Sequence, residues 1–393
     1  MLQDATRRFF EVEFVPREAG WAKNMMMERE AWNLAGSMGL LCASIPEQYG
    51  GGGGTLAHDI VIFSEQARAL IASFSNTVHS GIVAHYLLEY GSEEQKLRWL
   101  PKMASGELVA AIAMSEPGAG SDLQSIKTYA RREGSHYVIN GSKTFITNGY
   151  HADLVFVVAK TDPAQGARGI SIIVVETNGL LGFQRGKLLE KIGNKGSDTA
   201  ELFFQDMRVP AENLLGPEEG LGFKQLMAQL PAERLYIAMN AVAQMERAVA
   251  MTCDYVKERQ VFGQKLSDLQ NTRFKLAECQ TKATMARVFV DQCLMRCLDG
   301  NLDNATAAMA KWSSTQACNE VVYDCLQLHG GYGIMDEYPI ARMHANVRIG
   351  PIYGGSNEIM KEIIARSMFP LAQPQKAEET LRDTPALHAL HST

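Results

Sequence analysis

The chain has 393 residues, of which 46% are hydrophobic and 21% charged, and its formal net charge is −6. This length predicts two or three domains with a core that needs no disulfide bonds. The negative charge argues against a nucleic-acid partner, because proteins that bind nucleic acids usually carry a basic surface. It leaves room for an anionic ligand held in a local basic pocket.

The seven cysteines include no CxxC pair, so we expect neither a disulfide framework nor a metal site. Cys293 and Cys297 stand four residues apart in a helical stretch, where a metal pair is conceivable, but we favour buried thiols. No apolar run is long enough to cross a bilayer, and no signal peptide is visible. We therefore expect a cytoplasmic bacterial protein, whereas a mitochondrial matrix location would require that a leader has been removed.

Residues 1–110 indicate an N-terminal helical domain. Apolar residues recur there at spacings near 3.6, as from Ile60 to Leu70, and Ser92 and Gln95 have the spacing of a capping box. The glycine run 50–54 lacks the Lys-Ser/Thr of a phosphate loop, so we interpret it as a turn rather than a ligand site.

Residues 111–215 indicate a middle β-domain, in which Asn140-Gly141 predicts a hairpin turn. Its strands are predicted at 137–139, 154–158, 170–175 and 201–204. Residues 216–371 return to helical periodicity, with one apolar face from Ala238 to Thr252, and predict a C-terminal bundle. Residues 372–393 are expected to form a flexible tail. Helices, then strands, then helices correspond to a mainly helical α+β fold.

Three glycine-containing segments could carry chemistry. Residues 113–122 and 143–149 offer backbone N–H groups, hydroxyls and an aromatic ring to a flat ligand, although each alone is compatible with an ordinary turn or strand. In the second segment, Phe145 and Thr147 are two residues apart and should share one side of a strand. Residues 327–333 are unusually rich in glycine for a helical zone, and we expect a packing role for His329 there rather than a catalytic one.

Taken together, the segments resemble those of a known family. Ser115–Asp122, Phe145–Gly149, Arg259–Gly263, Gln327–Gly331 and Tyr353–Glu358 occur in the order seen in acyl-CoA dehydrogenases. The similarity runs from about residue 5 to 371 and resembles the long-chain acyl-CoA dehydrogenase branch most closely. It implies a helical N-terminal domain, a β-barrel-like middle domain and a C-terminal four-helix bundle, assembled as a homotetramer.

The resemblance also implies a function: FAD-dependent α,β-dehydrogenation of a fatty acyl-CoA in fatty-acid β-oxidation, with hydride passing to the flavin and electrons to an electron-transfer flavoprotein. The implied FAD-binding residues are Ile112, Met114, Ser115, Gly120, Ser121, Phe145, Ile146, Thr147, Arg259, Phe262, Gln270, Gln327, Leu328, Gly330, Gly331, Ser356 and Glu358. The implied substrate contacts are Ser121, Pro231, Arg234, Gly354 and Gly355. A same-fold oxidase and a catalytically silent binding subunit are the alternatives.

The resemblance departs from the commonest family pattern at the catalytic base. Many members carry a glutamate where this chain has Gly354. Residues 230–235 resemble the alternative base site of the long-chain and isovaleryl branches, which implies Glu233 as the base. Pro231 predicts a helix start, so Glu233 would lie in the first turn, where the positive helix end favours a carboxylate. We expect Gly354 to leave room for that carboxylate.

Overall fold

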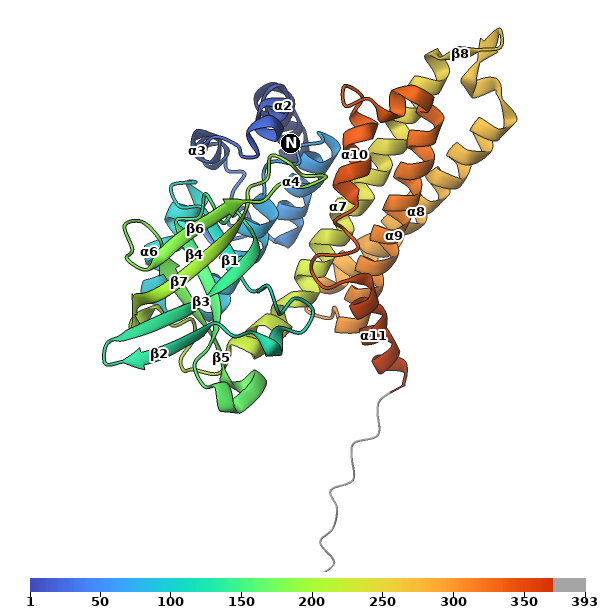
Figure 1. The fold of residues 1–393 in the computed structure, drawn as a ribbon. Coiled ribbons are helices and arrows are strands. Elements are labelled where there is room, and N and C mark those ends of the chain that lie inside the picture. The colour runs from blue at the N-terminus through green and yellow to red at the C-terminus, as the bar shows by residue number, and fades with distance from the viewer. Residues whose placement is uncertain (370–393) are drawn as a thin grey trace, which may run out of the picture.

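The computed structural model describes residues 1–369. The predicted flexible tail, residues 372–393, lies outside the described residues, as do the last two residues of the predicted C-terminal bundle. In Figure 1, N-terminal helices and a curled sheet form one half of the molecule, and long C-terminal helices form the other. The α+β fold class, with a sheet flanked by two helical regions, is confirmed.

The N-terminal region is helical, as predicted. Its α-helices are α1 Leu2–Phe9, α2 Val15–Asn24, α3 Arg29–Ser37, α4 Leu56–Arg68, α5 Ala84–Tyr90 and α6 Glu93–Ala104, with π-helical turns at Phe10–Phe14 and Thr77–Val83. The predicted capping box at the start of α6 is confirmed: Gln95 N–H donates to Ser92 Oγ at 3.2 Å, and Ser92 N–H donates to Gln95 Oε1 at 3.1 Å. Both exchanges satisfy donors that a helix end leaves unpaired.

The middle region forms one seven-stranded sheet. Its strands are β1 Ala110–Ala113, β2 Tyr129–Glu133, β3 His136–Thr147, β4 Leu154–Lys160, β5 Ile170–Glu176, β6 Phe183–Leu188 and β7 Thr199–Pro210. The order is β1-β4-β2-β3-β7-β6, and β5 pairs with β4. Strands β4 and β5 are buried along almost their whole length, which explains their continuous apolar runs.

The predicted hairpin at Asn140-Gly141 is wrong. The β2–β3 hairpin turns at Gly134-Ser135, a two-residue loop between the paired Glu133 and His136. Asn140-Gly141 instead lies inside β3, where the pairing with β7 shifts register. The Asn140 side chain spans this irregularity, since its Oδ1 accepts from the Asp206 N–H at 2.9 Å. A sequence pair typical of turns thus lies at a β-bulge, where Gly141 has a φ of +146°.

The C-terminal region contains three long helices, α7 Gly222–Glu258, α8 Gln270–Leu298 and α9 Asn304–His329, with shorter α10 Pro339–Val347 and α11 Asn357–Met368. A small hairpin, β8 Gln260–Val261 and β9 Gln264–Lys265, joins α7 to α8 at the tip of the bundle (Figure 1). The apolar face predicted from Ala238 to Thr252 is buried along α7.

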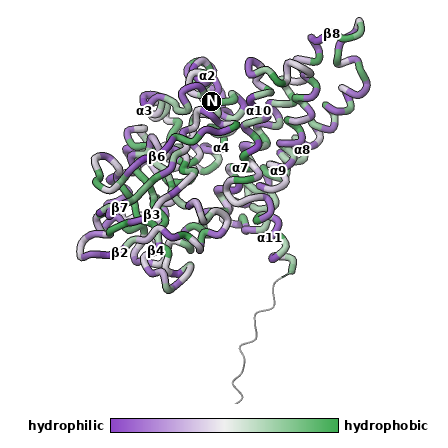
Figure 2. The backbone as a smooth tube through the Cα atoms, in the orientation of Figure 1, coloured by the Kyte–Doolittle hydropathy of each residue, from purple (hydrophilic) through white to green (hydrophobic). Residues whose placement is uncertain are grey.

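Hydrophilic and hydrophobic residues alternate along these helices (Figure 2). Within residues 1–369, no helix combines the length and apolarity that a membrane span requires. The same residues contain no cluster of metal-ligating side chains. Cys293 is buried and Cys297 half-buried, in agreement with the core role that we favoured.

The bulge at Gly141 leads to a stability prediction. A Cβ at Gly141 would lie 2.7 Å from the Thr128 Cα, whereas a Cβ at Gly134 would meet no atom within 4 Å, although both residues have positive φ. We expect Gly141→Ala to lower the free energy of unfolding by about 3 kcal/mol, and Gly134→Ala by only about 1 kcal/mol. Urea unfolding followed by circular dichroism measures both, and equal losses would contradict the bulge geometry.

Candidate active site

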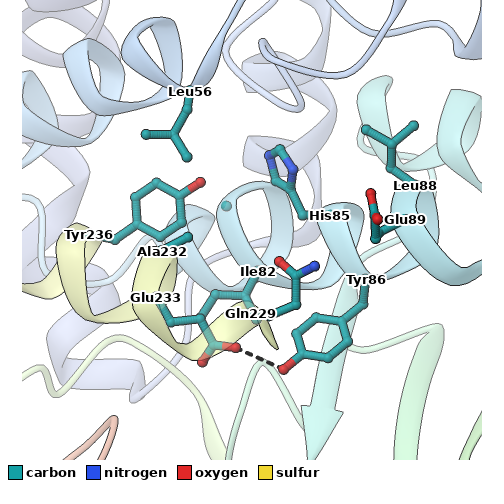
Figure 3. Close-up of a pocket in the computed structure, with 11 residues that line it drawn as sticks. Leu56, Ile82, His85, Tyr86, Leu88, Glu89, Gln229, Ala232, Glu233 and Tyr236 are labelled. Atoms are coloured by element: carbon teal, nitrogen blue, oxygen red, sulfur yellow. Dashed lines mark hydrogen bonds between the residues drawn. The ribbon is translucent and has the colours of Figure 1, made fainter. Parts of the chain in front are cut away.

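A cavity of about 180 Å³ lies where the N-terminal helices meet α7. Its lining comes from α4, α5, the turn before α5, and one stretch of α7 (Figure 3). The lining residues are Leu56, Gly81, Ile82, His85, Tyr86, Leu88, Glu89, Gln229, Ala232, Glu233 and Tyr236. Of the residues predicted for the site, all of which lie in the described part of the chain, Glu233 alone lines this cavity.

Glu233 is a buried carboxyl group at the edge of this cavity, with 7% of its surface exposed. The Tyr86 hydroxyl donates a hydrogen bond to its Oε1 at 2.9 Å (Figure 3). Burial raises the pKa of Glu233 to about 7, because a carboxylate loses hydration there, while Tyr86 and Arg234 act in the opposite direction. The group therefore exchanges its proton near neutral pH, as a general base requires.

The expectation that Glu233 lies at a helix start is wrong. α7 begins at Gly222, so Pro231 and Glu233 are well inside a continuous helix. Pro231 is tolerated there at the loss of one backbone hydrogen bond, to the Met227 carbonyl. Glu233 consequently lacks the stabilisation of a helix N-terminus, which is consistent with the raised rather than lowered pKa of its carboxyl group.

Gly354 also differs from expectation. It has a φ of +62°, a conformation that favours glycine. A Cβ at Gly354 would lie 2.3 Å from Cδ1 of Ile237, which stands one helical turn after Glu233 on α7. The space above Gly354 is therefore occupied by the Ile237 side chain, and the Glu233 carboxylate is not what fills it.

The loop that carries Gly354 and Gly355 is held by a buried lysine that no sequence motif indicates. Lys311 Nζ on α9 donates to the Gly355 carbonyl oxygen at 2.8 Å and to the Asn357 Oδ1 at 3.1 Å. Burial lowers the pKa of Lys311 to about 8. Arg234, predicted to contact substrate, is buried as well, and its Nη1 donates to Asn304 Oδ1 at 3.1 Å.

The first two glycine-containing segments meet at the end of β1. The Thr144 N–H donates to the Ser115 carbonyl at 3.0 Å, and buried Lys143 donates to the Met114 carbonyl at 2.9 Å. Phe145 has a φ of +59° and lies 70% exposed, next to a register shift between β3 and β7. Exposure nevertheless alternates over Phe145, Ile146 and Thr147, which are exposed, buried and half-buried, and the shared side of Phe145 and Thr147 stays a prediction.

Four of the residues predicted in the bundle, Arg259, Phe262, Gly330 and Gly331, lie toward the tip that carries the β8–β9 hairpin. Arg259 and Phe262 belong to the β8–β9 hairpin, which projects far from the sheet in Figure 1. The Arg259 guanidinium lies over the Tyr332 ring, 5.5 Å from its centre, and within residues 1–369 it forms no ion pair. Phe262 is 96% exposed. Gly330 and Gly331, after α9, face open space.

Ser356 caps α11, where its Oγ accepts from the Ile359 N–H at 3.4 Å, and Glu358 lies exposed in the first turn of that helix. His329 has the packing role that we expected: it is buried, stacks on Tyr255 at 4.2 Å, and contacts the Cys325 carbonyl through Nδ1 at 2.8 Å.

Three family descriptions match consecutive parts of the chain. The acyl-CoA dehydrogenase N-terminal, middle and C-terminal domains match residues 1–107, 111–207 and 220–369. The chain is 48% identical over 370 residues to the mitochondrial long-chain specific acyl-CoA dehydrogenase of Sus scrofa, covering 94% of this chain and 86% of that protein.

Solved structures agree with this match. An acyl-CoA dehydrogenase from Geobacillus kaustophilus superposes with a TM-score of 0.92 at 46% identity, covering 94% of this chain and 97% of that one. A glutaryl-CoA dehydrogenase from Mycobacterium smegmatis in complex with FADH2 superposes with a TM-score of 0.88 at 26% identity, covering 94% and 93%. The chain therefore belongs to the acyl-CoA dehydrogenase family and is an enzyme that dehydrogenates an acyl-CoA.

Proposed function

We propose that the protein is an FAD-dependent enzyme that converts a fatty acyl-CoA to its trans-2-enoyl-CoA in β-oxidation, with Glu233 as the base. One observation carries the assignment of the base: Glu233 is a buried carboxyl group on the cavity wall with a pKa of about 7. The residue at the alternative base position is Gly354, which has no side chain to act.

The reaction breaks one C–H bond at Cα and one at Cβ, and forms the C=C bond. Glu233 accepts the α-proton, and the electron pair left at Cα forms the new π bond as hydride leaves Cβ. FAD, when bound, supplies the acceptor of that hydride. Tyr86 holds the carboxylate through its hydrogen bond at 2.9 Å, and burial keeps water from competing for the carboxylate.

Two sets of residues fit an FAD molecule. Exposed Phe145 and the backbone around Ser115 offer an apolar ring and polar groups to a flavin, while Arg259 offers a fixed cation to a diphosphate. The first set belongs to the sheet, at β1 and β3, and the second lies beside the β8–β9 hairpin, which projects away from the sheet in Figure 1, so one chain would not span a single FAD. This separation supports a site shared between two copies.

The outer face of α8 supports the proposed homotetramer. Four large apolar side chains are more than half exposed there: Phe274 57%, Met285 68%, Val288 66% and Met295 55%. A second copy of the chain would cover such a face. An electron-transfer flavoprotein as the electron acceptor is the corresponding proposal for the partner, supported by family membership. The cytoplasmic location and the domain boundaries at residues 110 and 215 stay predictions.

Replacement of the base tests the proposed chemistry. Glu233→Gln keeps nearly the same volume, but an amide does not accept the α-proton. We expect the yellow holoenzyme to bind acyl-CoA normally, while flavin bleaching by acyl-CoA slows by at least about 100-fold. Anaerobic stopped-flow absorbance measures the rate. Exposed Glu218→Gln, a few residues before α7, is the matched control and should bleach at the wild-type rate. Wild-type bleaching in Glu233→Gln would refute the assignment.

The pKa of Glu233 predicts a pH profile. Below a pH of about 7 the carboxyl group is protonated, so kcat/KM should fall as the pH decreases through that value. The Tyr86 hydrogen bond stabilises the charged form, so Tyr86→Phe should move this limb to higher pH. Tyr137→Phe removes a hydroxyl on β3 that donates to Glu219 and does not line the cavity, so it should leave the profile unchanged. If the pH at which kcat/KM falls is the same in Tyr86→Phe as in the wild type, a group other than Glu233 controls this fall.

The shared cofactor site predicts the behaviour of Arg259→Ala. Loss of a cation that faces the diphosphate should weaken FAD retention by about tenfold or more, with an unchanged circular dichroism spectrum. Arg8→Ala, an exposed arginine on α1, is the control. Flavin absorbance after dialysis reports retention, and sedimentation reports assembly. A stable wild-type monomer that retains FAD would contradict the shared site.

A further inference from the structure

Besides Glu233, the cavity has a polar wall formed by Tyr236 and His85, and the proposed reaction does not use these two side chains. Tyr236 and His85 line the same cavity as Glu233. In Figure 3, the Tyr236 hydroxyl points away from the Glu233 carboxylate, toward the part of the pocket bordered by Leu56 and His85. A cavity meant only for a hydrocarbon chain would be lined there by apolar groups.

The Tyr236 hydroxyl is buried without a partner. The residue is 2% exposed, and its Oη has no hydrogen-bond partner within the described chain. The ring is held by edge-on packing against Phe63, with centres 5.5 Å apart, and by Gly81, whose open side faces the Tyr236 Cε2. Burial, reinforced by the charge of Asp59, keeps the pKa of Tyr236 well above its usual range, so the hydroxyl remains a donor.

The neighbours of His85 determine which of its nitrogens carries the proton. The Ser44 hydroxyl donates its only hydrogen to the carboxylate of buried Asp59. The Ser44 oxygen lies 2.8 Å from His85 Nε2, so it must accept a hydrogen from that nitrogen. In the neutral imidazole, Nδ1 is then the acceptor.

This Ser44–His85–Asp59 group is not a hydrolytic triad. In a triad the histidine stands between the serine and the acid, whereas here the serine stands between the other two. Asp59 lies 3.7 Å from the same Nε2, which favours a proton on that nitrogen. His85 Nε2 therefore does not act as a base that takes a proton from Ser44. The group orients His85 rather than creating a nucleophile.

We propose that the acyl chain of the substrate carries a hydroxyl group, which binds between Tyr236 and His85. A hydroxyl can accept from the Tyr236 hydroxyl and donate to His85 Nδ1 at once, while a ketone only accepts and an ammonium group only donates. A carboxylate would be repelled by Asp59 behind His85 and by Glu89 on the cavity lining. The inference rests on the proposed function, because it assumes that the acyl chain enters this cavity with its α-carbon near Glu233.

Binding of unreactive thioethers tests the inference apart from the reaction. S-octyl-CoA lacks the carbonyl group that acidifies the α-proton, so it binds without reacting, whichever residue is the base. Its affinity for the wild-type holoenzyme is compared by calorimetry with the affinities of its monohydroxylated isomers, one for each carbon of the distal chain. We expect one isomer to bind about tenfold more tightly than S-octyl-CoA, since only that isomer pairs the buried hydroxyl.

Two variants and one control test whether Tyr236 and His85 bind the hydroxyl group. In Tyr236→Phe and in His85→Leu, the preferred hydroxylated isomer should bind about as tightly as S-octyl-CoA. Tyr49→Phe should keep the tenfold preference for that isomer. Tyr49 is a buried tyrosine outside the cavity, whose hydroxyl donates to Glu93 at 3.0 Å. The inference is overturned if S-octyl-CoA binds as tightly as every hydroxylated isomer, or if the preference survives in both variants. Failure of the proposed reaction would appear instead as absent flavin bleaching by acyl-CoA thioesters.

Discussion

The hydrogen bond from Tyr86 to Glu233 joins the two halves of the molecule at the point where chemistry is expected. Tyr86 belongs to α5 and Glu233 to α7, 147 residues later. Burying a carboxylate at such a junction costs free energy unless a hydrogen-bond donor contacts it. The fold supplies one donor and leaves the carboxylate partly uncompensated, as its pKa of about 7 shows. The burial that destabilises the charged carboxylate also raises the pKa of Glu233 to a value suited to proton transfer at neutral pH.

Features determined by near neighbours could be predicted from the sequence. The apolar period of α7, the capping box of α6 and the apolar strands of the sheet each depend on residues a few positions apart. The glycine-containing segments were also visible, and the structure brings residues 113–122 and 143–149 together at the end of β1. Local patterns nevertheless misled at Asn140-Gly141 and at Pro231, because the partner strand and the continuous packing of α7 outweigh turn and helix-start preferences.

Contacts between distant residues could not be predicted in this way. Nothing near Lys311 in the sequence indicates that a buried lysine holds the Gly355 carbonyl, 44 residues away. Likewise, Ser44, Asp59 and His85 are unremarkable separately, and only the packing of three segments places the serine between an acid and an imidazole. Such clusters depend on tertiary structure, where a polar group is retained in the core only if its neighbours satisfy it.

One stretch of α7 connects the proposed base Glu233, the loop of Gly354 and Gly355, and the cavity wall formed by Tyr236. Glu233 and Tyr236 are three residues apart and Ile237 is four residues from Glu233, so all three share a face of the helix. Glu233 meets Tyr86, Tyr236 faces the other part of the cavity, and Ile237 fills the space above Gly354. A rotation of α7 about its axis would disturb all three contacts together. Pro231 removes one backbone hydrogen bond just before this stretch, so side-chain packing contributes more to the placement of this turn than in an unbroken helix. The proposed hydroxyl site and the proposed base are therefore coupled through the same turn of helix.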